Sequence, residues 1–186
     1  MTTRDSDSVA VLAGGVGAAR FLRGLVAAID PSHVTAVVNT GDDTELHGLA
    51  ISPDLDTVVY TLAGAIDPER GWGLAGETWQ AMGALERYTE ARPSGSAAGS
   101  TWFRLGDRDL ATHLYRTARR AEGATPTQVA AEIGAAWEVG VRLLPMTDGR
   151  FRTMLVLADG GETISFQDYF VRLQHGVAPS ARRAVR

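Results

Sequence analysis

The sequence lacks both cysteine and lysine, and its 18 positively charged residues are all arginine. Without cysteine, the chain forms no disulfide, no thiolate metal site and no cysteine nucleophile. Without lysine, it has neither the Walker-type phosphate loop, which needs that residue, nor Schiff-base chemistry. Whatever chemistry the chain performs must therefore use carboxylates, histidine, hydroxyls, amides and guanidinium groups.

Long apolar runs and basic clusters are also missing. No run approaches the roughly 20 apolar residues of a membrane-spanning helix. The net charge of -4 argues against nucleic acid or an anionic membrane as a partner. The polar, acidic start over residues 1–8 does not resemble a signal peptide. We therefore expect a cytoplasmic protein that binds neither nucleic acid nor membrane.

The 186 residues are 45% hydrophobic, which suffices for one substantial core. We expect a single α/β domain over residues 1–186, with a disordered tail at 1–8. The segment 92–100 is rich in glycine, serine and alanine, and is predicted to be a flexible loop.

The first third of the chain has the pattern of a β-α-β unit. Val9–Ala13 and Val34–Val38 are apolar and rich in β-branched residues, and Ala18–Ile29 has one apolar face. This spacing predicts a Rossmann-like parallel sheet with flanking helices. Further helices are expected at Asp56–Leu62, Glu77–Thr89, Asp109–Ala121 and Thr127–Trp137, strands at Val141–Leu144 and Arg152–Leu157, and either element at Ile164–Leu173.

Glycines follow the first predicted strand at Gly14, Gly15 and Gly17. They would let backbone N–H groups approach a phosphate at the positive end of the next helix. Arg20 stands where the dinucleotide fingerprint has its third glycine, which disfavours a nicotinamide or flavin site. The alternative is that these glycines only make a tight turn.

Acidic residues follow the second predicted strand. Asn39, Asp42 and Asp43 come at its carboxyl end, where parallel sheets bind ligands, and Asp54 and Asp56 follow a few residues later. Neighbouring carboxylates raise each other's pKa unless a cation or hydrogen-bond donors offset the repulsion. Mg²⁺ with substrate phosphate oxygens would do so. Singly, each aspartate is explained equally well as a turn or cap residue.

A third group surrounds the start of the helix predicted at Asp109. Arg104 and Arg108 lie close in sequence to the aromatic residues Trp102 and Phe103, a combination that suits a planar anionic ligand. Capping and ion pairing explain the same residues without a ligand. The residues alone thus indicate a metal-assisted phosphate-handling site at a sheet edge, which a generic nucleotidyl or sugar-nucleotide enzyme would share.

Seven motifs occur in an order that resembles one family: GGVGAARFLRGL, AVVNTGDD, ISPDLDTVVYTL, IDPERGWG, LGDRDLATH, LLPMTDG and ISFQDYFV. Together they are similar to the 2-phospho-L-lactate transferases of coenzyme F(420) biosynthesis, whose bacterial members are usually described as phosphoenolpyruvate transferases. The resemblance runs from Val9 to about Leu173.

The resemblance implies a transferase that requires Mg²⁺. A phospho-lactyl or phosphoenolpyruvyl group would pass from a guanosine diphosphate adduct to the ribityl hydroxyl of the deazaflavin Fo, and GMP would leave. Such in-line transfer needs charge neutralisation and alignment rather than covalent help from the protein.

The same resemblance assigns roles to residues. Asp56 and Arg104 would contact Fo, together with Thr57 and Arg108. Asn39, Asp42 and Asp43 would hold metal and substrate, with Asp42 as the metal ligand. The glycines of the first motif would line the phosphate-bearing side.

Family members are considerably longer, and their later half carries a Gly-Pro-Ser-Asn-Pro-type loop, expected to bind the donor, that this sequence lacks. We therefore expect a truncated N-terminal portion of the fold. The alternative to an active transferase is a catalytically incomplete deazaflavin- or nucleotide-binding fragment. A homodimer is one assembly that the chain could form. The choice between a lactate-derived and an enolpyruvate-derived donor stays open.

Overall fold

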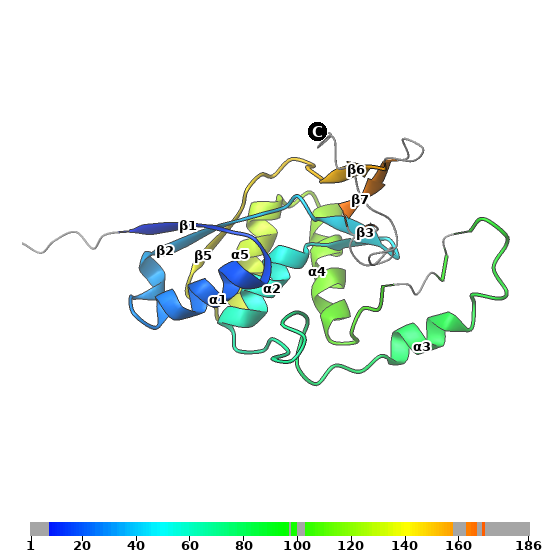
Figure 1. Cartoon of the computed structure of the whole chain (residues 1–186), viewed down its shortest axis with the longest axis horizontal. Helices are drawn as coiled ribbons and strands as arrows, with labels where there is room; N and C mark the ends of the chain where they lie inside the picture. The colour runs from blue at the N-terminus through cyan, green and yellow to red at the C-terminus, as the bar shows by residue number, and fades with distance from the viewer. Residues whose placement is uncertain (1–7, 97, 100–102, 158–162, 167–168, 170–186) are drawn as a thin grey trace, which may run out of the picture.

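A three-stranded parallel sheet organises the chain in the computed structural model, which describes residues 8–96, 98–99, 103–157, 163–166 and 169 (Figure 1). Its strands lie in the order β1 (Val9–Ala13), β2 (Val34–Val38) and β5 (Arg142–Pro145). β2 pairs in parallel with both neighbours. The predicted α/β class and the first two predicted strands are confirmed.

The other elements follow the predicted order with shifted bounds. The helices are α1 (Gly15–Val26), α2 (Pro53–Leu62), α3 (Gln80–Glu86), α4 (Asp109–Ala121) and α5 (Pro126–Ala136), with a 3₁₀ turn at Pro31–His33. Two antiparallel hairpins pair β3 (Thr44–Leu46) with β4 (Leu49–Ile51) and β6 (Met154–Val156) with β7 (Thr163–Ser165). None of the helices in this described part has the length and apolar character needed to span a bilayer.

Three details of the prediction were wrong. The helix expected at Glu77–Thr89 is the shorter α3, because Glu77 and Thr78 bond to the 107–109 segment instead. The hairpin β3–β4 lies inside the acidic stretch, where the sequence indicated only a loop. α2 begins after Ser52, not after a capping aspartate, so the carboxylates of Asp54 and Asp56 serve other partners.

Several expectations fall partly outside the described residues. The tail predicted at 1–8 is described only at Ser8, and the element expected at Ile164–Leu173 is described mainly by β7. Within the loop 92–100, the Arg92 guanidinium donates to the Ala98 carbonyl oxygen at 2.8 Å. Flexibility there stays a prediction.

The core lies on one face of the sheet. Alternate residues of β2, Val34, Ala36 and Val38, are fully buried, and Leu22 of α1 and Ile133 of α5 belong to the same cluster. α2 packs between these helices, and the Tyr60 ring meets Trp137 edge-on with centroids 5.1 Å apart. Packing on this face fixes the carboxyl ends of β1 and β2 against the start of α2.

Candidate active site

Asn39 joins the carboxyl ends of β1 and β2 to the start of α2. Its backbone N–H donates to the Ala13 carbonyl at 2.8 Å, which extends the β1–β2 pairing by one residue. Its side-chain amide donates to Asp54 at 2.8 Å, while its Oδ1 accepts from the Gly41 N–H at 2.9 Å. Asn39 thus fixes the turn after β2 and the carboxylate of α2 in one position.

Asp54 lies over the glycine turn that was predicted to bind phosphate. The Gly15 backbone N–H bonds to the Asp54 carboxylate, and Gly15 has φ of +57°, a conformation that favours glycine. A Cβ at Gly15 would lie 3.3 Å from Asp54, whereas one at Gly17 would meet nothing within 4 Å. In this conformation a carboxylate rather than a phosphate occupies part of the anion-binding end of α1.

Three carboxylates near this turn carry raised pKa values. Burial raises the pKa of Asp42, and repulsion from Asp54 adds to it. Burial also raises the pKa of Asp54, against the hydrogen bonds from Asn39 and Gly15. The described residues therefore compensate the negative charges of Asp42 and Asp54 only in part. A bound cation would supply the missing positive charge.

Asp43 has the most distinctive environment of the three. Burial raises its pKa to about 7, although Ser52 donates a hydrogen bond to its Oδ2 at 3.1 Å. Its Oδ1 is buried and has no hydrogen-bond partner among the residues that the structure describes. A carboxyl group with a pKa near neutrality can both accept and release a proton at physiological pH.

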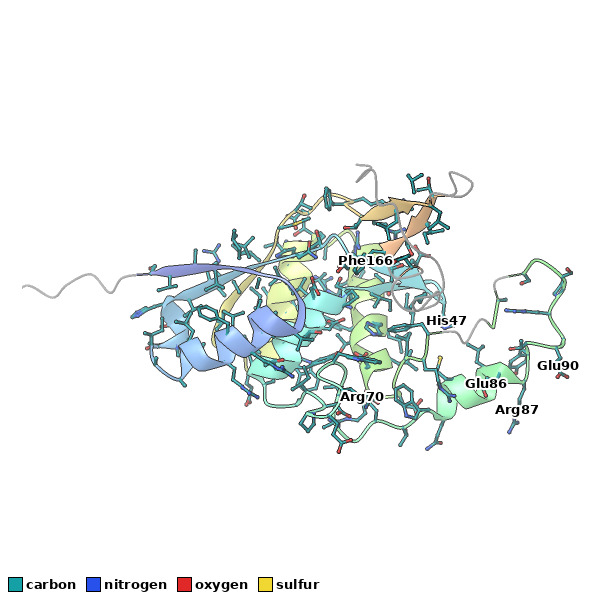
Figure 2. All side chains as sticks on the ribbon, in the orientation of Figure 1. His47, Arg70, Glu86, Arg87, Glu90 and Phe166 are labelled. Atoms are coloured by element: carbon teal, nitrogen blue, oxygen red, sulfur yellow. The ribbon has the colours of Figure 1, made fainter. Side chains whose placement is uncertain are left out.

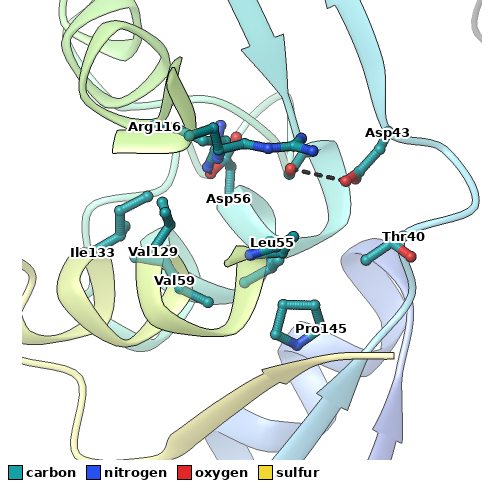
Figure 3. A pocket seen from close by; sticks show the side chains of 13 residues that line it. Thr40, Asp43, Leu55, Asp56, Val59, Arg116, Val129, Ile133 and Pro145 are labelled. Carbon is teal, nitrogen blue, oxygen red and sulfur yellow. Dashed lines mark hydrogen bonds and ion pairs between the residues drawn. The ribbon is translucent and has the colours of Figure 1, made fainter. Parts of the chain in front are cut away.

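Asp43 and Thr40 stand between two hollows. The first is a small hollow of about 20 Å³ lined by Arg116 and Leu55, with room for a single water molecule (Figure 3). The second, of about 290 Å³, is open and includes the β3–β4 hairpin and the segment 147–152. Only the second has space for a substrate group.

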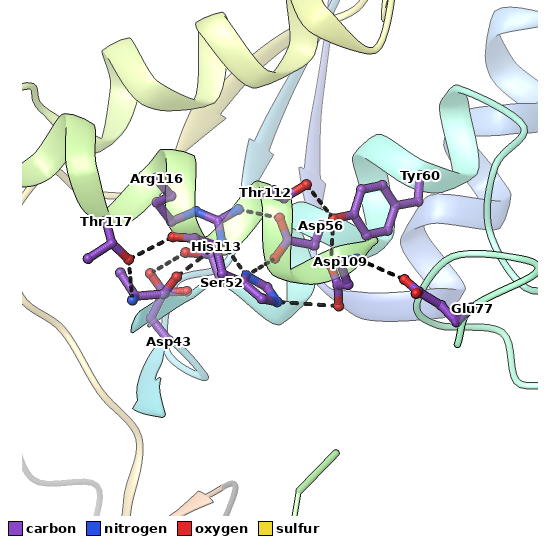
Figure 4. A network of polar contacts seen from close by, with 11 residues as sticks. Asp43, Ser52, Asp56, Tyr60, Glu77, Asp109, Thr112, His113, Arg116 and Thr117 are labelled. Carbon is purple, nitrogen blue, oxygen red and sulfur yellow. Dashed lines mark hydrogen bonds and ion pairs between the residues drawn. The ribbon is translucent and has the colours of Figure 1, made fainter. Parts of the chain in front are cut away.

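Asp56 belongs to a buried polar network rather than to an open surface (Figure 4). Arg116 of α4 donates to its Oδ1 and, at 3.3 Å, to the Ala50 carbonyl. The same guanidinium lies 3.1 Å from Nδ1 of His113. Because arginine only donates, Nδ1 accepts in this contact, and Nε2 of His113 lies 3.3 Å from Asp109.

The network continues to Tyr60, whose hydroxyl donates to Asp109 at 2.6 Å and lies 2.9 Å from the Thr112 hydroxyl. Burial opposes ionisation of Asp109, yet the contacts from His113 and Tyr60 lower its pKa. The network therefore joins α2 to α4, although Oδ2 of Asp56 and Nε2 of His113 are buried without a hydrogen-bond partner among the described residues.

Asp56, Asp109 and His113 bring ligand atoms within 4.8 Å of one another, the one such group in the described part of the chain. We judge it a poor metal site. The positive charge of Arg116 already balances Asp56, and His113 uses Nδ1 to accept from Arg116. A metal at the unpartnered Oδ2 of Asp56 and Nε2 of His113 would have to bind beside the positive charge of that guanidinium. Asp42 and Asp54 fit a cation better, because in the described part of the chain no cationic side chain is among the groups that shift their pKa values.

The side chains of Arg104 and Arg108 contact the 75–86 segment. Arg104 pairs with Glu86 of α3 at 3.2 Å, and its guanidinium lies 5.9 Å from the Trp79 ring centroid. Arg108 donates to the Ala75 carbonyl at 2.7 Å. Among the described contacts neither approaches Asp56, so the structure does not join these predicted acceptor contacts directly.

Aromatic rings gather beside Arg104. The Arg70 guanidinium lies over Trp72 and Trp79, 5.4 and 5.2 Å from their centroids, and Trp72 stacks with Phe103 at 6.2 Å. Figure 2 labels Arg70 on the loop before α3. We name Arg70, Trp72, Trp79, Phe103 and Arg104 the aromatic–arginine cluster. Trp72 is 43% exposed, which gives the cluster an accessible flat face.

Two carboxylates hold this cluster against α4. Glu77 accepts from the backbone N–H groups of Arg108 and Asp109 at the start of α4, both at 2.8 Å. Asp107 accepts from those of Gln80 and Ala81 at the start of α3, at 2.9 and 3.0 Å. Each segment therefore supplies acceptors to the start of the other's helix, so Asp107 accepts at the start of α3 and not at the start of the helix that follows it in sequence.

Sequence reasoning missed Arg116 and the contacts of His113 and Asp109, and it placed Asp54 in the acidic group without its contacts to Asn39 and Gly15. A signal for α4 was present: Asp109, His113 and Arg116 are spaced i, i+4, i+7 and so share one helix face. For Asp54 there was none, because its contacts with Asn39 and Gly15 depend on tertiary packing.

The comparisons with known proteins agree with this architecture. The family model described as 2-phospho-L-lactate transferase CofD matches residues 9–186. The phosphoenolpyruvate transferase of Kitasatospora aureofaciens is 46% identical over 176 residues, which cover 93% of this chain and 52% of that protein. The one from Nocardia farcinica is 47% identical over 174 residues, covering 91% and 50%. The chain thus spans about half the length of the curated relatives it matches.

A solved structure shares the fold. A crystal structure of a UPF0052 family member from Bacillus halodurans superposes with a TM-score of 0.50 at 18% sequence identity. The match covers 90% of this chain and 47% of that one.

Proposed function

Because the chain belongs to the 2-phospho-L-lactate transferase CofD family, we propose that it forms part of a transferase of coenzyme F(420) biosynthesis. The enzyme would move a phospho-lactyl or phosphoenolpyruvyl group from a guanosine diphosphate adduct to the ribityl hydroxyl of Fo and release GMP. A homodimer and a cytoplasmic location are further predictions, and the substrates are small molecules.

Asp43 is the observation that carries this proposal. Its Oδ1 is a buried acceptor without a partner, beside a hollow of about 290 Å³, and its pKa is raised to about 7. An attacking hydroxyl must lose its proton as the new P–O bond forms. Asp43 has the pKa and the free oxygen to accept that proton, while the P–O bond to GMP breaks and GMP leaves.

Mg²⁺ fits beside Asp43 at Asp42 and Asp54. Their raised pKa values mark carboxylates in need of positive charge, and Mg²⁺ takes one or two protein carboxylates together with substrate phosphate oxygens. When bound, the ion would neutralise charge on the transferring group. Asn39 orients Asp54 at 2.8 Å, and Gly14, Gly15 and Gly17 would line the phosphate side of the same site.

The aromatic–arginine cluster supports a planar acceptor. Trp72 and Phe103 offer stacking surface, and Arg104 adds an exposed cation that could reach an anionic oxygen of Fo. Asp56 and Thr57 are buried on α2. We propose that they hold the α2–α4 frame of the acceptor site and that Arg108 supports it through Ala75.

The decisive experiment incubates the chain with Fo, the guanosine adduct and Mg²⁺ and follows GMP and the charged deazaflavin by chromatography. We expect both products to appear together, and Asp43→Asn to abolish them while Glu90→Gln, an exposed control outside the hollow, does not. Tryptophan fluorescence reports Fo binding in parallel. Binding without GMP release would favour the catalytically incomplete fragment, whose support is that the chain spans half of its relatives' length. Absence of Fo binding would refute both.

A further inference from the structure

Three arginines line the open hollow beside Asp43 without partners in the described part of the chain. The hollow of about 290 Å³ includes Arg120 from the last turn of α4, and Arg150 and Arg152 from the segment before β6. Among the described residues, none of these guanidinium groups donates a hydrogen bond or forms an ion pair. We call this space, with its three guanidinium groups, the arginine hollow.

The segment that carries two of these arginines is held at both ends. The Met146 N–H donates to the last carbonyl of β2 at 2.8 Å, and the Thr153 N–H donates to the Gly41 carbonyl. Between these points, Asp148 accepts from the backbone N–H and the hydroxyl of Thr127 at the start of α5, both at 2.8 Å. A segment anchored in this way lowers the ordering cost that a ligand would otherwise meet on binding.

Two buried polar atoms lie where the arginine hollow meets the acidic turn. Oγ1 of Thr40 and Oδ1 of Asp43 have no hydrogen-bond partner among the described residues, and both side chains line the hollow. Burial raises the pKa of Asp43, and the charge of Arg120 acts against that rise without forming an ion pair. A buried hydroxyl without a partner costs free energy, which a ligand oxygen would recover.

The charges of the arginine hollow favour an anionic ligand. Its charged lining consists of three guanidinium groups against the carboxyl groups of Asp43 and Glu45. A guanidinium binds a carboxylate or a phosphate through two parallel N–H donors, and these arginines have their donors available. Carboxylate and phosphate are therefore the two ligand groups to be distinguished.

We propose that the arginine hollow binds the carboxylate of the three-carbon acid carried by the donor and so positions the reacting phosphorus beside Asp43. The identity of the acid rests on the proposed function. In a phospho-lactyl or phosphoenolpyruvyl group, only the ester oxygen and one carbon separate phosphorus from the carboxylate, so the two must occupy adjoining spaces. Asp43 borders the hollow and directly follows Asp42, which is proposed to hold Mg²⁺ on the phosphate side.

This assignment makes the three arginines and Thr40 positioning residues. Their contacts would fix the acid, and a fixed acid holds the attached phosphorus in line for attack. A phosphoester that lacks the carboxylate would lose these contacts, so the hollow would select an acid-bearing donor over other phosphoesters.

The test measures binding of 2-phospho-L-lactate and of ethyl phosphate, which is the same phosphoester with hydrogen in place of the carboxylate. Calorimetric titrations with Mg²⁺ present compare the parent chain with Arg120→Gln and Arg150→Gln. Arg87→Gln, an exposed arginine on α3 outside the hollow, is the matched control (Figure 2). Circular dichroism verifies that each variant is folded.

We expect the parent chain to bind 2-phospho-L-lactate at least about tenfold more tightly than ethyl phosphate. Each variant of the hollow should lose most of that difference through weaker binding of the acid, while Arg87→Gln keeps it. Equal affinities of the parent chain for the two compounds would overturn the proposal. An equal loss for ethyl phosphate in Arg120→Gln and Arg150→Gln would overturn it too, because the hollow would then bind a phosphate.

GDP and turnover complete the test. GDP lacks the acid, so its affinity should be the same in Arg120→Gln as in the parent chain, and a loss would assign the hollow to the nucleotide instead. If the parent chain and both variants release GMP from the guanosine adduct with the same kcat/KM, the carboxylate site is refuted and the transferase stands. If none of them releases GMP but the acid is still discriminated, the carboxylate site stands and turnover by this chain is refuted.

Discussion

Arg116 and Asp56 form an ion pair inside the molecule, with 5% and 8% of their side-chain surfaces exposed. The guanidinium also donates to the Ala50 carbonyl and to His113, so its donors are satisfied on several sides. Satisfied donors are what allow such a buried pair to form. The pair joins α2 to α4. α2 also carries Asp54, whose carboxylate contacts the glycine turn.

The first prediction concerns this pair. Asp56→Asn preserves shape but leaves the Arg116 charge buried without its counter-ion. We expect the free energy of unfolding to fall by about 3–5 kcal/mol in urea titrations. The double variant Asp56→Leu with Arg116→Met should lose less than the sum of the single losses. A loss below about 1 kcal/mol for Asp56→Asn would show a pair no stronger than one on the surface.

The second prediction concerns pH and Asp43. Its pKa of about 7 in the folded chain exceeds the ordinary aspartate value of 3.8, so the folded state binds the proton more tightly. Between these two pH values the folded state holds more protons, and stability therefore falls as pH rises. Asp43→Asn should flatten that fall and stabilise the chain at pH 8 by a few kcal/mol, on the order of 1.4 per pKa unit.

Urea titrations from pH 4 to about pH 8 would measure this slope. Glu45→Gln removes a charge from an exposed neighbour on β3 and serves as the control. If Asp43→Asn leaves the slope as steep as in the parent chain, another group is responsible for it, and the proton-accepting role proposed for Asp43 loses its support.

The third prediction uses two glycines. A Cβ at Gly106 would lie 2.2 Å from the Glu77 carboxylate carbon, so Gly106→Ala must displace the group that caps α4. We expect a loss of about 1–2 kcal/mol. Gly83 lies inside α3, where a Cβ meets nothing within 4 Å, so Gly83→Ala should stabilise by up to about 1 kcal/mol. Thermal unfolding followed by circular dichroism measures the stability of both variants. Equal changes in stability would contradict the contacts by which the 77–81 and 107–109 segments hold each other's helix starts.

The sequence was sufficient for the β-α-β frame because apolar periodicity and glycine turns are local signals. Val9–Ala13, Val34–Val38 and Asp109–Ala121 have the predicted bounds. The start of α5 has a local signal as well, because Thr125 and Gln128 form a capping box there. The β3–β4 hairpin lacked such a signal: each strand has three residues, too few for alternation to show.

Only part of the candidate site could be predicted from the sequence. Convergence of Asn39, Asp42 and Asp43 at a strand end followed from the pattern of a parallel sheet. The burial of Asp56 did not, because its partner Arg116 lies 60 residues away and only packing of α4 on α2 brings them together. Residues that pair across so long a stretch of chain have no regular spacing that would reveal the contact in the sequence.

The fourth prediction compares two candidate metal sites. If Mg²⁺ binds at Asp42 and Asp54, it should stabilise the chain by about 1–3 kcal/mol at saturating concentration, since it binds the folded state. Asp42→Asn and Asp54→Asn should each abolish that gain, while Asp148→Asn, an exposed carboxylate beside α5, should not. Loss of the gain in Asp109→Asn alone would place the ion at the buried Asp56–Asp109–His113 group instead. Isothermal titration calorimetry would give the stoichiometry for each variant.

The last prediction separates a phosphate-binding turn from a merely tight one. Gly15 needs its positive φ, but a Cβ at Gly17 meets nothing within 4 Å in α1. Gly17→Ala should therefore stabilise the free chain by up to about 1 kcal/mol. If a phosphate approaches this backbone, the added methyl group should weaken binding of a guanosine nucleotide by about tenfold, or 1.4 kcal/mol. Calorimetric titration with GDP measures the affinity, and Gly24→Ala, also open to solvent space in α1, is the matched control. Unchanged affinity in Gly17→Ala would mean that no phosphate contacts Gly17, which would leave the anion-binding end of α1 to the Asp54 carboxylate.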